Sequence, residues 1–140
     1  YGDLTRTFVK GPAPSAVKTL FDVVLRGQQL ALERICADVA GKDIHQAIKD
    51  LFAAEGYETG EKDGYMQGFF HSTGHGLGLE IHEAPSIGPR PGVLKENHVV
   101  TVEPGLYYRG LGGVRIEDVV VVQENGCENL TTFPKYLEVE

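Results

Sequence analysis

Apolar residues in the first half of the chain recur with the spacing of amphipathic helices. From Ser15 they follow one another at intervals of three and four as far as about Val39, which predicts a long helix with one face in the core. A second apolar stripe begins after Asp43, a possible capping residue, and ends before Gly56. We expect both helices to be structural, and we place His45, which lies beside the second stripe, on the helix surface.

The second half of the chain changes to short apolar pieces separated by Gly, Pro and Asn. The clearest predicted strands are residues 98–103 and 113–122, and the second is so rich in β-branched residues that we expect it inside a sheet. Residues 1–9 also have the composition of a strand. Because helices come first and strands follow, the pattern indicates an α+β fold in which helices cover one face of a sheet.

Composition limits the classes of partner. The chain has 140 residues, of which 41% are hydrophobic, enough for the core of one domain. Its formal net charge of −7 and the lack of a basic run exclude a nucleic-acid-binding face. No apolar run reaches the roughly 20 residues of a membrane helix, so we expect no membrane partner and a cytoplasmic location. Cys36 and Cys127 form no CxxC pair, and we expect both to be reduced and buried.

A histidine cluster is the first candidate for chemistry. His71, His75 and His82 make up three of the five histidines, and they lie among three glycines, which would let a backbone approach whatever the imidazoles hold. One interpretation is an imidazole that coordinates a metal while its neighbours steer protons. The alternative is a glycine-rich loop with incidental polar residues, and the cluster alone does not decide between them.

Carboxylates in predicted strands favour the metal. Glu103 ends one strand, and Glu117 lies in the middle of another, where a buried carboxylate is costly unless it is paired or bound to a metal. The alternative for Glu117 is an ion pair with Arg115, two residues earlier on the same strand face. With Asp3 and one histidine, the set suits Mn(II), Co(II) or Fe(II) better than a thiolate-preferring structural zinc. Carboxylates can also bridge two ions that activate water for hydrolysis.

Four motifs in order carry a family resemblance. They are Asp-Leu-Thr-Arg-Thr-Phe, Gly-His-Gly-Leu-Gly-Leu-Glu-Ile-His-Glu-Ala-Pro, Val-Glu-Pro-Gly-Leu-Tyr and Gly-Val-Arg-Ile-Glu-Asp. Together they resemble the pita-bread metallopeptidases, specifically the Xaa-Pro branch of prolidase and aminopeptidase P. The resemblance covers essentially the whole chain and implies a truncated pita-bread fold, with two helices packed on a curved, mainly antiparallel sheet. The last two motifs differ from the versions in methionine aminopeptidase.

The resemblance also implies roles for individual residues. In that family a dinuclear centre, often of manganese, is held by aspartate, histidine and glutamate side chains. The matching metal ligands are Asp3, His75, Glu103 and Glu117. The matching catalytic residues are His71, His82, Glu103 and Arg115, and the matching substrate-binding residues are His71, His82 and Tyr107.

One family ligand has no counterpart in the chain. The first metal aspartate of the family lies on a strand just before the second, and this sequence starts two residues before Asp3. We therefore expect residues 1–140 to be the C-terminal portion of a pita-bread catalytic domain, without its first part and without the N-terminal domain. Such a portion would bind at most one ion, with Mn, Co, Zn or Fe as candidates, and would be inactive by itself. Exposed sheet edges would favour a homo-oligomer.

For the parent protein the resemblance implies metal-dependent hydrolysis of peptide bonds preceding proline, as an Xaa-Pro dipeptidase or aminopeptidase with proline at P1′. The alternatives are a non-catalytic pita-bread scaffold, a creatinase-like amidinohydrolase that keeps the fold without the metal, and another family peptidase such as methionine aminopeptidase. The presence of all four matching ligands favours a metallopeptidase over the first two.

Overall fold

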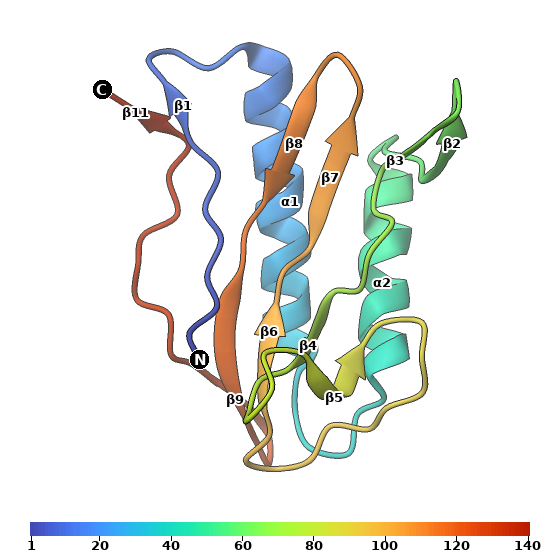
Figure 1. The fold of residues 1–140 in the computed structure, drawn as a ribbon, viewed down its shortest axis with the longest axis vertical. Coiled ribbons are helices and arrows are strands. Elements are labelled where there is room, and N and C mark those ends of the chain that lie inside the picture. The colour runs from blue at the N-terminus through green and yellow to red at the C-terminus, as the bar shows by residue number, and fades with distance from the viewer.

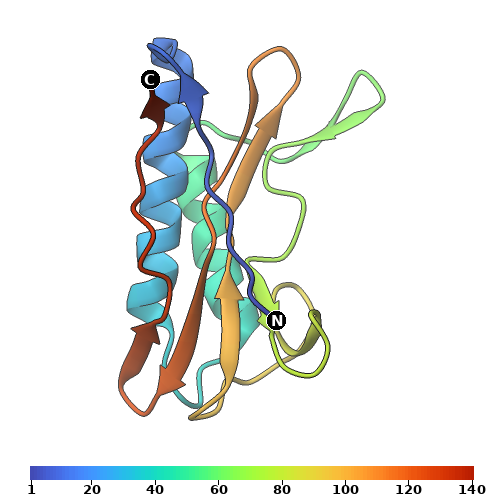
Figure 2. The ribbon, with the colours of Figure 1, turned by 60° about the vertical axis from the view of Figure 1, so that its left-hand side comes forward.

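The computed structural model describes residues 1–140 as a layer of two helices against a layer of strands (Figures 1 and 2). Helix α1 spans Ser15–Arg34 and helix α2 spans Gly41–Ala54. The two helices lie side by side behind the strands, as Figure 1 shows. This arrangement confirms the expected α+β fold, and neither helix is both long and apolar enough to cross a membrane.

The main sheet has five strands in the order β10-β9-β6-β4-β5, and every neighbouring pair is antiparallel. Along the chain its members are β4 (Gly74–Gly76), β5 (Glu83–Ile87), β6 (Val99–Val102), β9 (Asp118–Gln123) and β10 (Gly126–Asn129). Strand β6 confirms the strand predicted at residues 98–103, with Glu103 just beyond its end.

Three further strand pairs form separate two-stranded sheets. Two are antiparallel hairpins, β2 (Gly60–Lys62) with β3 (Tyr65–Gln67) and β7 (Gly105–Tyr108) with β8 (Gly112–Arg115). The third joins the two ends of the chain, because β1 (Val9–Lys10) pairs in parallel with β11 (Glu138–Val139). Figures 1 and 2 both show the C-terminus beside β1.

The core lies between the two layers. Valines at alternate positions of β6 and β9 are buried, namely Val100, Val102, Val120 and Val122. The helices approach closely where Gly27 of α1 meets the buried ring of Phe52 in α2, since a Cβ added to Gly27 would lie 2.6 Å from Phe52 Cε1. Packing of this apolar face, more than local propensity, stabilises both helices.

The first helix is shorter than the apolar spacing predicts. It ends at Arg34 instead of near Val39. Ile35 is fully buried but already extended, and the N–H of Ala37 donates to the carbonyl of Gln123 at 3.0 Å. The apolar spacing therefore continues into a segment whose backbone hydrogen-bonds with β9 instead of with its own helix.

The starts of two other elements also differ from the prediction. Helix α2 begins at Gly41, so Asp43 lies inside its first turn and makes no capping hydrogen bond. The strand predicted for residues 1–9 is present only in part, as an isolated antiparallel bridge between Thr5 and Glu117 and as β1.

The strand predicted at residues 113–122 is two strands. Strand β8 ends at Arg115 and β9 begins at Asp118, so Glu117 does not lie within a continuous strand. Here the chain leaves one hairpin and joins the main sheet: the N–H of Glu117 donates to the carbonyl of Thr5 at 3.0 Å. The bridge with Thr5 falls beside Glu117 and Asp118, the two acidic residues in a run that is otherwise rich in β-branched residues.

The two cysteines are free, as expected, but they are partly exposed, so the expectation that both are buried is wrong. Cys127 Sγ contacts the carbonyl of Leu32 at 3.5 Å.

Candidate metal centre

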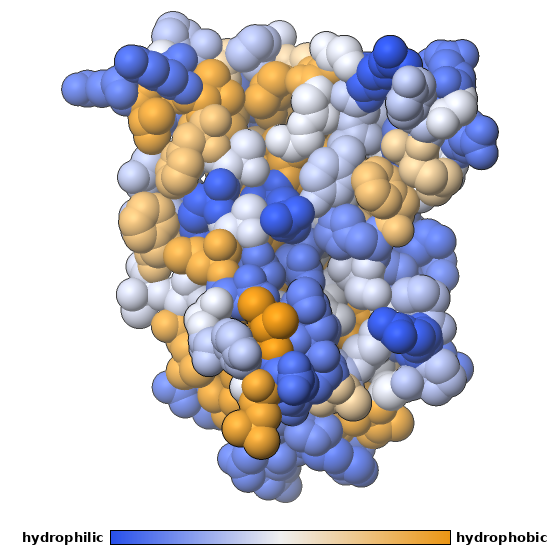
Figure 3. Space-filling model, viewed as in Figure 1, coloured by the Kyte–Doolittle hydropathy of each residue, from blue (hydrophilic) through white to orange (hydrophobic).

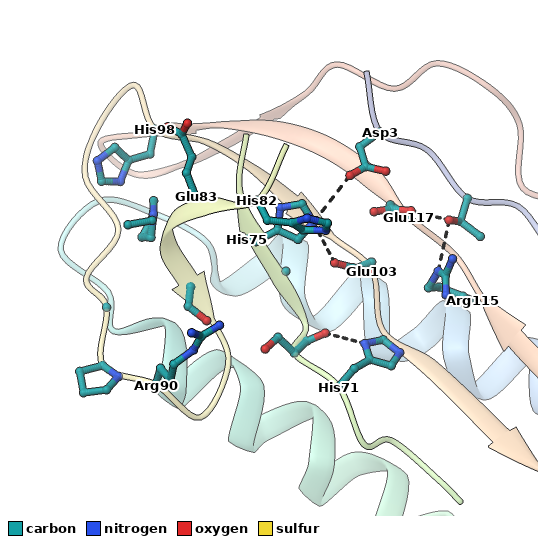
Figure 4. A pocket seen from close by; sticks show the side chains of 18 of the residues that line it. Asp3, His71, His75, His82, Glu83, Arg90, His98, Glu103, Arg115 and Glu117 are labelled. Atoms are coloured by element: carbon teal, nitrogen blue, oxygen red, sulfur yellow. Dashed lines mark hydrogen bonds and ion pairs between the residues drawn. The ribbon is translucent and has the colours of Figure 1, made fainter. Parts of the chain in front are cut away.

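An open cleft of about 1310 Å³ is lined by the N-terminal segment, by residues between His71 and His98, and by Glu103, Arg115 and Glu117. Hydrophilic side chains run down the middle of this face of the molecule, and apolar ones flank them (Figure 3). Of the residues that the sequence assigns to a site, all but Tyr107 line the cleft, namely Asp3, His71, His75, His82, Glu103, Arg115 and Glu117. Figure 4 shows them converging from four separate segments.

His75 is central to the cleft. Its Nδ1 lies 3.1 Å from the carbonyl oxygen of Gly76, to which it can donate, and this contact turns Nε2 into the cleft. Nε2 lies 3.2 Å from Glu103 Oε1 and 3.6 Å from Asp3 Oδ2. The hydrogen bond with Glu103 is the main cause of a raised pKa at His75. A proton or a metal ion on Nε2 would thus be surrounded by carboxylate oxygens.

The glycines beside His75 serve the sheet. A side chain at Gly74 would collide with the carbonyl of Thr101, and one at Gly76 with the carbonyl of Ala84. These glycines let β4 lie close to its neighbours β6 and β5. The structure thus gives both glycines a packing role, and the expectation that they also let the backbone approach a ligand stays a prediction.

Three donor groups form a compact set. One ligand atom from each of Asp3, His75 and Glu117 lies within 4.8 Å of the others. Glu117 is only 3% exposed, and burial is the main cause of its raised pKa, to which the carboxylates of Glu103 and Asp3 add. Clustered carboxylates repel one another unless a cation balances them, and oxygen donors with one imidazole suit a hard divalent ion. The residues therefore fit a metal.

The alternative of an ion pair between Arg115 and Glu117 is not what the structure shows. Arg115 Nε donates to Thr5 Oγ1 at 3.2 Å, and Arg115 Nη1 donates to the hydroxyl of Tyr107 at 3.2 Å. The hydroxyl of Thr5 in turn donates to Glu117 Oε2. Thr5 thus lies between the guanidinium and the carboxylate.

A second chain of hydrogen bonds fixes His71. Its Nδ1 lies 2.8 Å from the carbonyl of Ser72, and its Nε2 lies 3.0 Å from the hydroxyl of Tyr107. Since Tyr107 accepts from Arg115, its own proton is free to go to Nε2, and this polarity describes a neutral imidazole. The pKa of His71 is lowered, chiefly by burial, in agreement with that state.

His82 lies on the loop between β4 and β5. Its ring centroid is 4.3 Å from that of His75, and the two rings are inclined at 61°. The structure therefore places His82 beside the candidate metal ligand His75.

His45 is not the surface residue that the sequence predicts. It is 7% exposed, its Nδ1 lies 3.0 Å from Thr73 Oγ1, and its ring is 5.0 Å from that of Phe69. Burial lowers its pKa to about 4. The apolar spacing of the helix could not predict the burial of His45, because the residues that cover it, Phe69 and Thr73, come from the segment that leads into β4.

Two threonines of the site were missed by the sequence reasoning. Thr5 binds Glu117, as described above, and Thr101 Oγ1 accepts from the backbone N–H of His75 at 3.0 Å while lying 3.4 Å from Glu103 Oε1. Each stands two residues from a predicted ligand in extended chain, so the two-residue period of strands was the signal that could have found them. The other end of the cleft, with Arg90 and His98, was also missed (Figure 4).

Comparison with known proteins identifies the family. The model of metallopeptidase family M24 matches residues 1–124. The chain belongs to metallopeptidase family M24. Use of a divalent metal, which the family implies, agrees with the oxygen-rich donor set in the cleft.

Individual M24 relatives match almost the whole chain. The Xaa-Pro dipeptidase of Pyrococcus furiosus is 40% identical over 136 residues, which are 96% of this chain and 37% of that protein. The crystal structure of X-Pro aminopeptidase from Thermotoga maritima has a TM-score of 0.88 at 41% identity, and the match covers 99% of this chain and 38% of that one. The prolidase of Pyrococcus furiosus has a TM-score of 0.85 at 39% identity, covering 96% and 38%.

These likenesses confirm both the expected Xaa-Pro branch of M24 and its pita-bread fold. The chain spans little more than a third of the length of the relatives it matches.

Proposed function

We propose that a whole protein containing this chain is a metal-dependent hydrolase of peptide bonds preceding proline, either an Xaa-Pro dipeptidase or an Xaa-Pro aminopeptidase. The observation that carries the proposal is the approach of Asp3, His75 and Glu117 donor atoms to within 4.8 Å in an M24 chain. The names of its relatives support the Xaa-Pro preference. We place the protein in the cytoplasm and residues 1–140 in the C-terminal portion of its catalytic domain.

Asp3, His75 and Glu117 are the residues that would hold the ion, with Glu103 as the fourth ligand. Manganese suits this set, and Co, Zn and Fe are alternatives. When bound, such an ion supplies a Lewis acid that polarises a carbonyl and activates water. We propose at most one ion in the present chain and two in the whole protein.

Glu103 is the residue to which we assign proton transfer. Its Oε1 lies in the cleft 3.2 Å from His75 Nε2, within hydrogen-bonding reach of a group bound there. The carboxylate can accept a proton from an attacking water and return it to the leaving amine.

His71, His82 and Arg115 handle the charge that develops on the substrate. Arg115 is connected to His71 through the hydroxyl of Tyr107, so the guanidinium fixes the orientation of the imidazole. His82 faces the same cleft from the opposite loop. Both ring nitrogens of the neutral His71 are engaged, so the donors left for the substrate are on Arg115 and His82, and His71 acts by accepting or passing on a proton. Preorganised donors stabilise developing negative charge more than mobile ones do. Tyr107, which does not line the cleft, acts on the substrate only through His71 and Arg115 in this arrangement.

The test uses the whole protein with Mn(II). Gly-Pro and longer Xaa-Pro peptides are the substrates, Gly-Ala is the matched substrate without proline, and metal content is measured by mass spectrometry. Glu117→Ala should lose metal and activity together, whereas Glu33→Ala, an exposed change on α1, should lose neither. Metal and activity that both survive in Glu117→Ala would contradict the ligand assignment.

Two outcomes would favour the other candidate functions. Preferential removal of N-terminal methionine would indicate a methionine aminopeptidase, and a protein that takes up no metal and cleaves no peptide would indicate a binding scaffold. Residues 1–140 alone should be nearly inactive. A rate near that of the whole protein would overturn that part of the proposal.

We also propose that the isolated chain self-associates as a homo-oligomer. Phe8, Phe133 and Tyr136 form a cluster of rings with centroids 5.3 to 6.4 Å apart, and each remains more than 40% exposed. Sedimentation of residues 1–140 as a monomer at micromolar concentration would refute self-association.

A further inference from the structure

Arg6 is a buried arginine with every donor engaged. Its side chain is 4% exposed, and its guanidinium donates to five acceptors. They are the backbone carbonyl oxygens of Thr5, Glu117, Phe133 and Pro134 and the side-chain Oδ1 of Asp118, at 2.9, 2.7, 2.7, 3.2 and 2.7 Å respectively. An arginine has five N–H groups in a fixed plane, so none is left for another partner.

These acceptors belong to three segments that are far apart in sequence. One is the N-terminal segment, the second is the junction between β8 and β9, and the third is the tail before β11. Asp118 is 0% exposed and has two further partners. Its Oδ2 accepts hydrogen bonds from Lys135 Nζ at 2.6 Å and from Asn129 Nδ2 at 2.7 Å. We call Arg6, Asp118, Asn129 and Lys135 the arginine clamp.

The arginine clamp contacts the candidate metal centre directly, through the backbone of Thr5 and Glu117. One nitrogen of Arg6, Nη1, binds the carbonyls of both Thr5 and Glu117. The same two residues form the only β pairing of residues 1–8, in which the N–H of Glu117 donates to Thr5 at 3.0 Å. Figures 1 and 2 show this N-terminal segment running beside β9 without a strand ladder of its own.

A segment with one bridge would fray unless something else held it. Asp3 lies two residues beyond that bridge, so its distance from Glu117 depends on the bridge being closed. We propose that Arg6 is a positioning residue, whose guanidinium fastens the N-terminal segment to the β8–β9 junction and thereby keeps Asp3 and Glu117 at metal-binding distance. The effect on metal binding rests on the proposed metal site, whereas the fastening does not.

Lysine distinguishes this role from a simple charge interaction. Arg6→Lys keeps the positive charge beside Asp118, but its ammonium has three donors and cannot span acceptors on three segments. If only the positive charge mattered, Arg6→Lys would keep the N-terminal segment fastened and bind metal like the wild type. If the position of the donors matters, Arg6→Lys should do neither. Ile48→Val is the matched control, because it weakens the core from helix α2 by removing a buried methyl group far from the clamp.

The first measurement is amide hydrogen exchange in the metal-free whole protein. Arg6→Lys should accelerate exchange at the N–H of Glu117 at least tenfold, while the N–H of Val120, inside β9, should change no more than in Ile48→Val. An unchanged rate at Glu117 in Arg6→Lys would overturn the proposal, because the bridge would then be closed without the clamp.

The second measurement is titration with Mn(II). Arg6→Lys should raise the dissociation constant at least tenfold, and Ile48→Val should leave it within twofold of the wild type. If exchange at Glu117 accelerates but the dissociation constant does not change, the clamp is structural only and its positioning role is refuted. If the wild type takes up no Mn(II) while exchange responds as expected, the proposed function fails and the fastening of the segment is upheld.

Lys135→Ala provides a milder variant should Arg6→Lys not fold. It removes one of the two contacts to Asp118 Oδ2 and leaves Arg6 in place. Exchange at Glu117 and the Mn(II) dissociation constant should shift in the same direction by a smaller factor. No shift in either would refute the clamp.

Discussion

Replacing Glu117 with glutamine should change stability in opposite directions with and without metal. The substitution keeps the shape of the side chain and an oxygen that accepts the hydroxyl proton of Thr5, but it removes a negative charge from a site shared with Asp3 and Glu103. Without a metal, the neighbouring carboxylates repel the charge of Glu117, which destabilises the folded protein. With a metal bound, the carboxylate of Glu117 is one of its ligands, which stabilises the folded protein.

The size of the effect follows from the geometry. Two unit charges 4.8 Å apart, the upper limit for the Asp3 and Glu117 ligand atoms, repel by about 3.5 kcal/mol at an effective dielectric constant of about 20. Asp3 is 21% exposed, and His75 beside it offsets part of the negative charge, so solvent and partner together reduce the repulsion to about 1 kcal/mol. Glu117→Gln should therefore stabilise the metal-free protein by about 1 kcal/mol.

Bound metal should make the wild type more stable than Glu117→Gln. At a free ion concentration 100 times the dissociation constant, binding stabilises the wild type by about 2.7 kcal/mol. A variant whose affinity is about 100-fold weaker gains only about 0.4 kcal/mol at the same concentration. The wild type should then be the more stable protein by about 1 kcal/mol.

Urea denaturation in EDTA and in excess Mn(II) measures both quantities in one protein. Glu33→Gln, an exposed change of the same kind on α1, should be neutral under both conditions. The reasoning would be refuted if Glu117→Gln destabilised the metal-free protein, or if Mn(II) stabilised the variant as much as the wild type.

Three further predictions concern residues around the site and in the core. Tyr107→Phe removes the hydroxyl between His71 and Arg115 and should lower kcat about 10- to 100-fold with metal content unchanged, as rate assays and metal analysis would show. Burial lowers the pKa of His45 from 6.5 to about 4, so below pH 6.5 the unfolded state binds more protons. The metal-free protein should lose up to about 3 kcal/mol as the pH falls from 6.5 to 4, and His45→Gln should lack that part of the slope in urea titrations. Gly27→Ala should gain about 1 kcal/mol of helix propensity but lose more through overpacking, because its Cβ would lie 2.6 Å from a buried ring of α2, and its Tm should fall.

The elements of the fold were predictable where a local pattern decides them. The three- and four-residue spacing located both helices, and the β-branched runs located β6 and β9. The break at Glu117 was missed because the β-branched residues before and after Glu117 and Asp118 predict one continuous strand, whereas the chain there pairs with Thr5, 112 residues away in sequence. The end of α1 was missed for the same kind of reason, since a hydrogen bond to β9 competes there with the helix.

The candidate site, too, could be predicted from the sequence only in part. Motifs identified the side chains that converge on the cleft, because the chemistry of each is visible in its own short segment. The arginine clamp was not visible, since the partners of Arg6 lie between 111 and 128 residues away apart from its neighbour Thr5. His45 illustrates the same limit: its burial depends on Thr73 and Phe69, which a helical pattern cannot include.

The three candidate carboxylate ligands share a structural position that explains this dependence, whereas His75 lies within β4. Glu103 lies between β6 and β7, Glu117 lies between β8 and β9, and Asp3 lies on a segment with a single bridge. At Glu103 and Glu117 a single backbone hydrogen bond, to Thr73 and to Thr5 respectively, stands in place of a continuous ladder, so fewer backbone contacts hold a side chain that turns into the cleft. Buried polar contacts must then replace the ladder, and Arg6 and Thr5 supply them at the junction where Asp3 meets Glu117. The geometry of the proposed metal centre therefore depends on residues that need not touch the metal themselves.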